Sequence, residues 1–187
     1  MTTHLIYEQC LFSKLKMNEL KHPLEHEWCF WLFKNETTNW EENLVEMTSF
    51  NTVEDYWCLY HHMKLPSELQ KGKDYAIFKK GIRPMWEDEA NKSGGRWMLL
   101  LDGGKIAHLD RIWLDAVLLL IGENFEYPND ICGVVVNVRA KSKISVWLRS
   151  NEMAMVLKVG KKLKAQFQIN QKLHYYVHNT SKSKYSL

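Results

Sequence analysis

Tryptophan content is the feature that most constrains this chain: 187 residues contain eight, at positions 28, 31, 40, 57, 86, 97, 113 and 147. An indole has a large apolar face and an N–H that needs a partner when it is buried. One core of this size encloses only a few of them. Four lie on predicted strands or on a helix's inner face and are predicted core residues, namely Trp28, Trp31, Trp97 and Trp113.

Composition places the chain among ordinary globular domains, with 45% hydrophobic and 25% charged residues. The net charge of +3 is too small for a protein that coats nucleic acid by charge alone. The four cysteines are scattered without a Cys-x-x-Cys pair, so we expect no metal, no cofactor and no disulfide framework. No signal-peptide core or transmembrane run is found in the sequence. We expect a monomeric cytoplasmic protein, with a nuclear pool remaining open.

Hydrophobic periodicity predicts one domain over residues 22–187, which ends in a short polar tail and follows a mobile arm over residues 1–21. Strands are predicted over residues 27–33, 74–78, 96–101, 131–139, 143–149 and 172–178. Helices are predicted over residues 53–64, 110–121 and 151–165. Because strands and helices mix without strict alternation, the predicted class is α+β with a largely antiparallel sheet.

Two of the predicted helices carry apolar residues outside their core-facing stripe. Thr52-x-x-Asp55 resembles a capping box at the start of the first helix, and Val53 and Trp57 lie at the edge of its apolar stripe. In the second helix Leu114, Leu118 and Ile121 lie opposite the inner stripe. A helix that is apolar on all sides is either fully buried or meets a partner.

Three tryptophans have no predicted place in the core. Trp40 and Trp86 lie in polar loops, and Trp147 alternates onto the polar face of its strand beside Lys143. Each could fold back as a lid on the core, but three together favour a ligand. Indoles stack on a nucleotide base, most strongly on a cationic one. The neighbouring carboxylate Glu87 could accept guanine N–H groups, and nearby cations could hold phosphates. This combination describes the N7-methylated guanosine cap of messenger RNA.

Long ordered motifs over about residues 21–149 resemble the eukaryotic translation initiation factor 4E family. They are His22-Pro23-Leu24, Trp28 with Trp31-Leu32-Phe33-Lys34, Thr52-Val53-Glu54-Asp55-Tyr56-Trp57, Pro84-Met85-Trp86-Glu87-Asp88-Glu89, Gly94-Gly95-Arg96-Trp97, Leu109-Asp110-Arg111 with Trp113-Leu114, and Val135-Val136-Asn137-Val138-Arg139-Ala140-Lys141. The resemblance implies a strongly curved sheet with three helices on its convex face and a cap pocket on its concave face.

The same resemblance assigns residues to the pocket. It implies that Trp40 and Trp86 stack on the methylated base, that Glu87 and the backbone N–H of Trp86 hydrogen-bond the guanine, and that Trp147 contacts the methyl group. The residues that it implies for the phosphates are Arg139, Lys143, Arg96 and Lys141.

On the convex face the resemblance implies a surface for partners with a tyrosine-x4-leucine-apolar helix: the initiation scaffold and repressor proteins. Its residues are His22, Pro23, Val53, Trp57, Leu114, Asp115 and Leu118. Asp115 departs from the glutamate usual in the family, and the loop at residues 140–143 is one residue shorter than usual. Both departures suggest a divergent paralogue.

Three functions remain to be compared. The first is a cap-binding initiation factor that recruits the scaffold, and its alternative is a cap-binding translational repressor that does not recruit it efficiently. The third is a nucleotide-processing enzyme with Glu87 as general base. No nucleophile motif, spaced histidine set or second catalytic group accompanies Glu87. We therefore expect a binding protein without catalytic residues.

Overall fold

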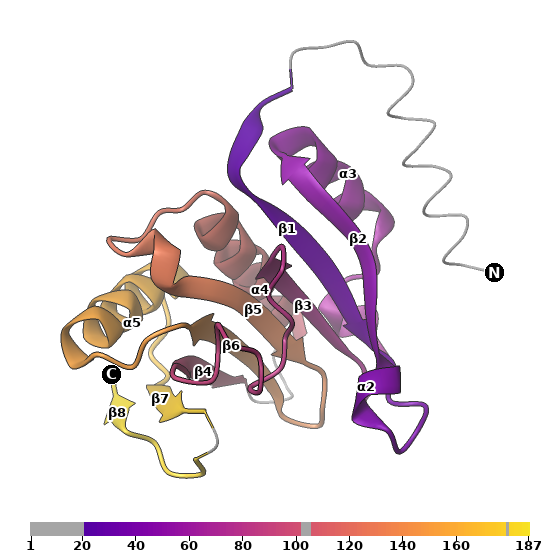
Figure 1. Cartoon of the computed structure of the whole chain (residues 1–187). Helices are drawn as coiled ribbons and strands as arrows, with labels where there is room; N and C mark the ends of the chain where they lie inside the picture. Colours follow the sequence, from indigo (N-terminus) through magenta and orange to yellow (C-terminus); the bar gives the residue numbers. More distant parts are fainter. Residues whose placement is uncertain (1–20, 102–105, 179) are drawn as a thin grey trace.

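A computed structural model describes residues 21–101, 106–178 and 180–187 (Figure 1). The strands are β1 (Pro23–Phe33), β2 (Leu44–Thr52), β3 (Asp74–Lys79), β4 (Gly95–Leu101), β5 (Ile131–Asn137), β6 (Ser142–Leu148), β7 (Leu173–Val177) and β8 (Tyr185–Ser186). The helices are α2 (Trp40–Asn43), α3 (Val53–His62), α4 (Ile106–Ile121) and α5 (Met153–Phe167), with 3₁₀ turns η1 (Pro66–Glu68) and η2 (Pro128–Asp130).

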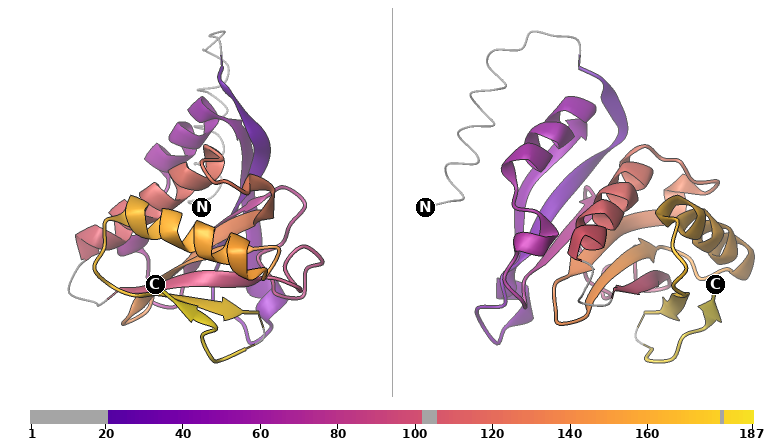
Figure 2. Two further views of the ribbon diagram at one scale, coloured as in Figure 1. Left: turned by 90° about the vertical axis from the view of Figure 1, so that its left-hand side faces the viewer. Right: turned by 180° about the vertical axis from the view of Figure 1, so that it is seen from behind.

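Within these ranges the eight strands form one sheet in the order β2-β1-β3-β5-β6-β4-β7-β8, and each neighbouring pair is antiparallel. The sheet curves strongly, and α3, α4 and α5 lie together on one of its faces (Figure 2). The predicted α+β class and the three helices on one face are thus confirmed. The one-turn helix α2, which was not predicted, begins at Trp40 at the end of the β1–β2 loop.

The start of α3 and the end of α4 lie where capping residues in the sequence predict them. The Thr52 side chain accepts a hydrogen bond from the Asp55 N–H at the start of α3, as the capping pattern predicts. Helix α4 ends at Ile121 before Gly122, but it starts at Ile106, one turn before the predicted start at residue 110. Helix α5 approaches the sheet closely at Gly160, where an added Cβ would lie 2.4 Å from the Trp97 ring.

One hydrophobic core fills the space between the helices and the convex face of the sheet. Alternate strand residues supply it, including Leu99, Val146 and Tyr175, and the helices supply Ile112 and Leu163. Three of the four predicted core tryptophans belong to it and are nearly inaccessible, namely Trp28, Trp97 and Trp113. Ile121 is also buried in this core, so its predicted outward orientation on α4 is wrong.

The C-terminal segment is more ordered than a polar tail. Tyr185 pairs with Tyr175 and Ser186 with His174, which adds β8 to the edge of the sheet. Leu187 exchanges two backbone hydrogen bonds with Leu173 and packs against the core. Of the predicted arm over residues 1–21, only Lys21 lies within the described residues. No helix in the described ranges is long and apolar enough to cross a membrane.

Candidate functional site

A cavity of about 480 Å³ lies on the concave face of the sheet, opposite the helices. Seven helices and strands and the β3–β4 loop line it with the residues Trp31, Phe33, Trp40, Glu41, Leu44, Asp74, Tyr75, Ala76, Pro84, Met85, Trp86, Glu87, Arg96, Met98, Val135, Asn137, Lys143, Ser145 and Trp147. Six of the eight residues predicted for the cap pocket are among them. They are Trp40, Trp86, Glu87, Arg96, Lys143 and Trp147.

Strand register explains why the face is hollow at this place. Ala76, Val135 and Ser145 are cross-strand neighbours on β3, β5 and β6, so three small or short side chains form one row across the sheet. Trp31 begins this row on β1 and Met98 continues it on β4. The larger side chains therefore form walls around a shallow floor.

The loop before Trp40 is fixed by one buried asparagine. Asn43 Oδ1 accepts hydrogen bonds from the N–H groups of Glu36 (2.6 Å) and Thr37 (3.0 Å). Its Nδ2 donates to the carbonyls of Thr37 (2.7 Å) and Asn39 (2.9 Å). The Trp40 ring packs on Phe33, with centroids 5.8 Å apart, and is still 42% exposed. An exposed indole on a rigid loop is preorganised for stacking.

The loop that carries Trp86 and Glu87 is fixed by a second buried asparagine. Asn91 Nδ2 donates to the carbonyls of Arg83 (2.9 Å) and Met85 (2.7 Å), and Asn91 is fully inaccessible. The Asp88 carboxylate closes the same loop by accepting from the N–H groups of Arg83 and Ala90. Trp86 is 46% exposed at the tip of this loop.

Four charged groups of the cavity have no ion-pair partner among the described residues: Glu41, Glu87, Lys143 and Arg96. Glu87 is exposed, and its carboxylate makes no ion pair or hydrogen bond within the part of the chain that is described. Lys143 likewise has no acidic partner there, although it lines the cavity. Burial lowers the pKa of Arg96, and the neighbouring Tyr176 opposes that shift. The cavity thus presents two carboxylates and two cations to a ligand, and Glu87 is the carboxylate next to Trp86.

Arg96, His178 and Trp147 form a packed wall on one side of the cavity. Arg96 Nη1 donates to His178 Nδ1 at 3.2 Å, and the Arg96 guanidinium lies 5.8 Å from the centroid of the Trp147 ring. His178 lies against Trp147 and Phe78 meets it edge-on, so Trp147 is only 9% exposed. Trp147 therefore has a packing role that its polar-face position did not indicate, as well as a surface in the cavity.

Arg139 and Lys141 are not brought into the lining. Arg139 forms a bidentate pair with Asp74, with Nη1–Oδ1 at 2.5 Å and Nη2–Oδ2 at 3.1 Å. Asp74 lines the cavity and also accepts from Asn137 Nδ2 at 2.8 Å. Arg139 thus neutralises the acid at the cavity wall, while Lys141 is exposed on the β5–β6 hairpin.

Sequence reasoning missed several lining residues and misplaced one. Trp31 was predicted to be core, but it lies on the concave face and lines the cavity, so that prediction is wrong. It lies three residues after Trp28 on β1, and the alternation of a strand places these two side chains on opposite faces. Asp74 and Asn137 were also missed, because they become neighbours only through the pairing of β3 with β5, which the local sequence does not reveal.

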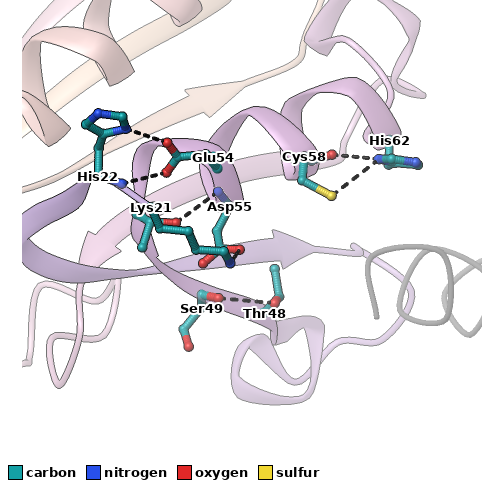
Figure 3. Close-up of polar contacts among 9 residues, drawn as sticks. Lys21, His22, Thr48, Ser49, Glu54, Asp55, Cys58 and His62 are labelled. Carbon is teal, nitrogen blue, oxygen red and sulfur yellow. Dashed lines mark hydrogen bonds and ion pairs between the residues drawn. The ribbon is translucent and has the colours of Figure 1, made fainter. Parts of the chain in front are cut away.

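On the convex side, the start of β1 is clamped to the start of α3 (Figure 3). The Glu54 carboxylate accepts from the His22 N–H at 3.0 Å and lies 2.6 Å from His22 Nδ1. These bonds to His22 lower the pKa of Glu54 to about 2. Lys21 Nζ lies 2.8 Å from Asp55 Oδ1. His22 and Pro23 are thereby held beside Val53, as the predicted partner surface requires.

The remaining residues of that predicted surface lie on α3 and α4, neighbouring helices of the same face (Figure 2). Val53 and Leu118 are each 37% exposed, and both Trp57 and Leu114 are half-buried against the core. Asp115 is paired with Arg111 one helical turn away, at 3.2 Å. An apolar patch with a single carboxylate therefore remains accessible on the convex face.

Comparison with known proteins identifies the family of this chain. The family model described as eukaryotic initiation factor 4E matches residues 23–186. The chain is 48% identical over 163 residues to eukaryotic translation initiation factor 4E1 of Drosophila melanogaster, and 52% identical over 132 residues to human eukaryotic translation initiation factor 4E. The matches cover 84% and 68% of this chain, but only 63% and 61% of the respective relatives.

Solved structures show the same fold. An Ascaris suum initiation factor 4E-3, solved with the m7G cap, has a TM-score of 0.86 and 42% identity, and the match covers 90% of this chain and 98% of that one. A Caenorhabditis elegans 4E-3, solved with the 4E-binding protein Mextli, has a TM-score of 0.86 and 39% identity, covering 90% and 100% of the two chains. By its sequence match and by its fold, this chain belongs to the eukaryotic initiation factor 4E family.

Proposed function

We propose that this protein binds the 7-methylguanosine 5′ cap of messenger RNA and recruits the scaffold of the translation initiation complex. The observation that carries the proposal is the concave cavity. It combines two half-exposed indoles on rigid loops, the Glu87 carboxylate, which has no partner among the described residues, and two cations. A flat cationic base followed by phosphates matches each of these groups.

In this proposal, Trp40 and Trp86 stack on the two faces of the base. The positive charge of the N7-methylated ring strengthens the stack through the electron-rich indole faces. Glu87 accepts the N1 and N2 protons of guanine, and the backbone N–H of Trp86 donates to O6. Trp147 presents an apolar edge to the methyl group. The exposure of both indoles supports these roles, since neither is needed to close the core.

Phosphates are held by Lys143 and Arg96, which line the cavity without an acidic partner in the described chain. Arg139 and Lys141 assist from the β5–β6 hairpin. For Arg139 this requires it to share its guanidinium between Asp74 and a phosphate, because Asp74 holds it now. Multivalent phosphate contacts of this kind make binding dependent on salt.

The convex patch of Val53, Trp57, Leu114 and Leu118 receives a helical peptide with the tyrosine-x4-leucine-apolar pattern. We propose that it comes from the initiation scaffold, and that repressors of the 4E-binding kind compete for it. Solved relatives occur with a cap or with a 4E-binding protein, which supports both surfaces. We further propose that the protein acts in the cytoplasm as a binding protein and not as an enzyme.

Titration of tryptophan fluorescence with m7GTP and with GTP tests the cap site. We expect m7GTP to quench strongly and to bind at least about tenfold more tightly than GTP, because only the methylated base is cationic. Equal affinities would refute the proposal. Recovery of unchanged m7GTP after incubation is expected for a binding protein, and a new product would show an enzyme.

A matched pair of variants tests Glu87. Glu87→Ala should remove the preference for guanine, since the base loses its hydrogen-bond acceptor. Glu89→Ala is the control, because Glu89 is an exposed acid of the same loop whose ion pair in the described part of the chain is with Lys92. If both variants bind m7GTP as the unmodified protein does, Glu87 does not read the base.

A further inference from the structure

Glu41 lines the cavity, but neither the sequence resemblance nor the proposed function gives it a role. It follows Trp40 in the first turn of α2 and is exposed. Its backbone N–H donates to Asn39 Oδ1 at 3.1 Å, which fixes the start of the helix. Within the ranges that the structure describes, its carboxylate has no ion pair and no hydrogen bond. A ligand in the cavity therefore meets a second carboxylate besides Glu87.

Stabilisation of α2 is the simplest role for an acid at this position, because a negative charge in the first turn interacts favourably with the helix dipole. Glu42 lies in the same turn and is also exposed. It accepts a hydrogen bond from Asn39 Nδ2 at 3.0 Å, so it contributes to the cap of the helix. Of the two acids, Glu41 alone lines the cavity that the described residues form. Helix stabilisation thus accounts for Glu42 but leaves the position of Glu41 unexplained.

The order of the strands separates the charges of the cavity. Helix α2 lies in the connection between β1 and β2, so Glu41 is on the side of the cavity nearest that edge of the sheet. Lys143 and Arg96 lie on β6 and β4, which follow β3 and β5 in the sheet. Asp74, an acid of β3 between the two sides, is paired with Arg139. The cavity therefore has an acidic side at α2 and a cationic side at β6 and β4.

This polarity matches a ligand that has a cationic base at one end and phosphates at the other. In the proposed complex Trp40 stacks on the base, so the adjacent Glu41 lies near its positive charge, while Lys143 and Arg96 hold the phosphates. The N7-methylated base carries that charge, and unmodified guanine does not. Glu87 accepts N1 and N2 protons that both bases have. A charge beside Trp40 therefore distinguishes the two bases in a way that the hydrogen bonds of Glu87 do not.

We propose that Glu41 is a specificity residue that selects the methylated cap by charge. The inference rests on the proposed function, since Trp40 must hold the base. Coulomb attraction acts over several ångströms, so Glu41 does not need to hydrogen-bond the base. Its charge also repels the phosphates, but m7GTP and GTP carry the same phosphates, and the repulsion cancels from the preference between them.

The test measures the ratio of the dissociation constants of GTP and m7GTP in the unmodified protein and in three variants. Glu41→Gln removes the charge and keeps the size of the side chain, and we expect the ratio to fall at least about threefold. Glu41→Asp keeps the charge and should keep most of the preference. Glu42→Gln is the matched control, because it removes the same charge from the same helical turn but outside the cavity lining. It should leave the ratio within about 1.5-fold.

The nucleosides 7-methylguanosine and guanosine repeat the comparison without phosphates. Glu41→Gln should weaken 7-methylguanosine at least about threefold and leave guanosine unchanged, because only the methylated base is charged. Equal weakening of both nucleosides would show a contact with the ribose or another group that they share, and would overturn the inference. An unchanged ratio in Glu41→Gln, or an equal fall in Glu42→Gln, would overturn it as well. Failure of m7GTP to bind the unmodified protein would instead overturn the proposed function.

Discussion

His178 lies against the Trp147 indole, with ring centroids 4.2 Å apart and an angle of 41° between the ring planes. Its Nδ1 accepts from Arg96, which can only donate, so the proton of the neutral ring must be on Nε2. Burial, with a further contribution from Arg96, lowers the pKa of His178 to about 4. A neutral histidine therefore positions both a wall of the cavity and one of its cations.

The first prediction concerns stability between pH 7.5 and pH 5. His178 takes up a proton near pH 6.5 in the unfolded chain but only near pH 4 in the folded one. Its contribution to stability is therefore complete above pH 6.5 and is lost as pH falls toward 4. We expect the unmodified protein to lose about 2 kcal/mol more than His178→Gln between pH 7.5 and pH 5.

Urea unfolding of both proteins at the two pH values measures this difference. Other titrating groups are common to both proteins and cancel in the comparison. His108→Gln is the control, since His108 is an exposed histidine of α4, on the other side of the sheet. Parallel loss of stability in the unmodified protein and His178→Gln would show that His178 is protonated normally.

The second prediction concerns the loop that carries Trp86. Asn91→Ala removes two hydrogen bonds to the carbonyls of Arg83 and Met85, each worth about 1 kcal/mol. The loop then samples more conformations, so m7GTP affinity should fall by about tenfold. Asn151→Ala is the matched control, because its Nδ2 also donates to a backbone carbonyl, that of Ser93, at the far end of the same connection.

A double-mutant cycle separates positioning from general damage. If Asn91 acts by holding Trp86, its substitution should cost much less affinity in a Trp86→Ala background. Calorimetry should show that the loss in Asn91→Ala is chiefly entropic. Equal effects in the two backgrounds would mean that Asn91 does not act through Trp86.

Sequence patterns were sufficient where one face of an element is polar. Strict alternation over residues 143–149 predicted that Lys143 and Trp147 share a face, and the register confirms it. Over residues 27–33 the pattern failed, because the cavity makes the concave face of β1 apolar as well. Trp31 could therefore not be distinguished from a core residue by hydrophobicity. Only the pairing of β1 with β3 shows on which face it lies.

Contacts between distant segments could not be predicted from local patterns. Asp74 and Arg139 are 65 residues apart, and their pairing follows from the antiparallel register of β3 with β5. The two asparagines that fix the tryptophan loops carry no periodic signal. Strand β8 has only two residues, too few for alternation to show.

The third prediction concerns the ion pair between Asp74 and Arg139. Arg139→Ala leaves the Asp74 carboxylate, 12% exposed, without its bidentate partner at the cavity wall. We expect the free energy of unfolding to fall by about 1–3 kcal/mol. We also expect the affinity for m7GTP to fall more than it does in Lys141→Ala, which loses one cation of the same hairpin. Lys141→Ala is the control, since it removes a cation of the same hairpin that has no role at Asp74. The unpaired Asp74 carboxylate should repel the phosphates of m7GTP. Asp74→Asn in the Arg139→Ala background should therefore restore part of the affinity, and no recovery would contradict this explanation.

The fourth prediction concerns the convex face. Leu118 is a large apolar side chain exposed on α4, and Leu118→Arg places a charge at the centre of the proposed peptide site. A helical peptide with the tyrosine-x4-leucine-apolar pattern should then bind at least about tenfold more weakly, because it would have to bury that charge. Affinity for m7GTP should stay within about twofold, since the cavity lies on the opposite face of the sheet.

Met153→Arg is the matched control for this prediction. Met153 is 58% exposed on α5, so the substitution adds the same charge to the helical face away from Val53 and Trp57. Isothermal titration of the peptide into each variant, with and without m7GTP, measures both surfaces on one sample. A loss of peptide affinity in Met153→Arg as large as that in Leu118→Arg would show a nonspecific effect of charge. Undiminished binding to Leu118→Arg would place the peptide elsewhere. Leu118 lies one helical turn after Leu114 on α4, so a helix that covers Trp57 and Leu114 also approaches Leu118.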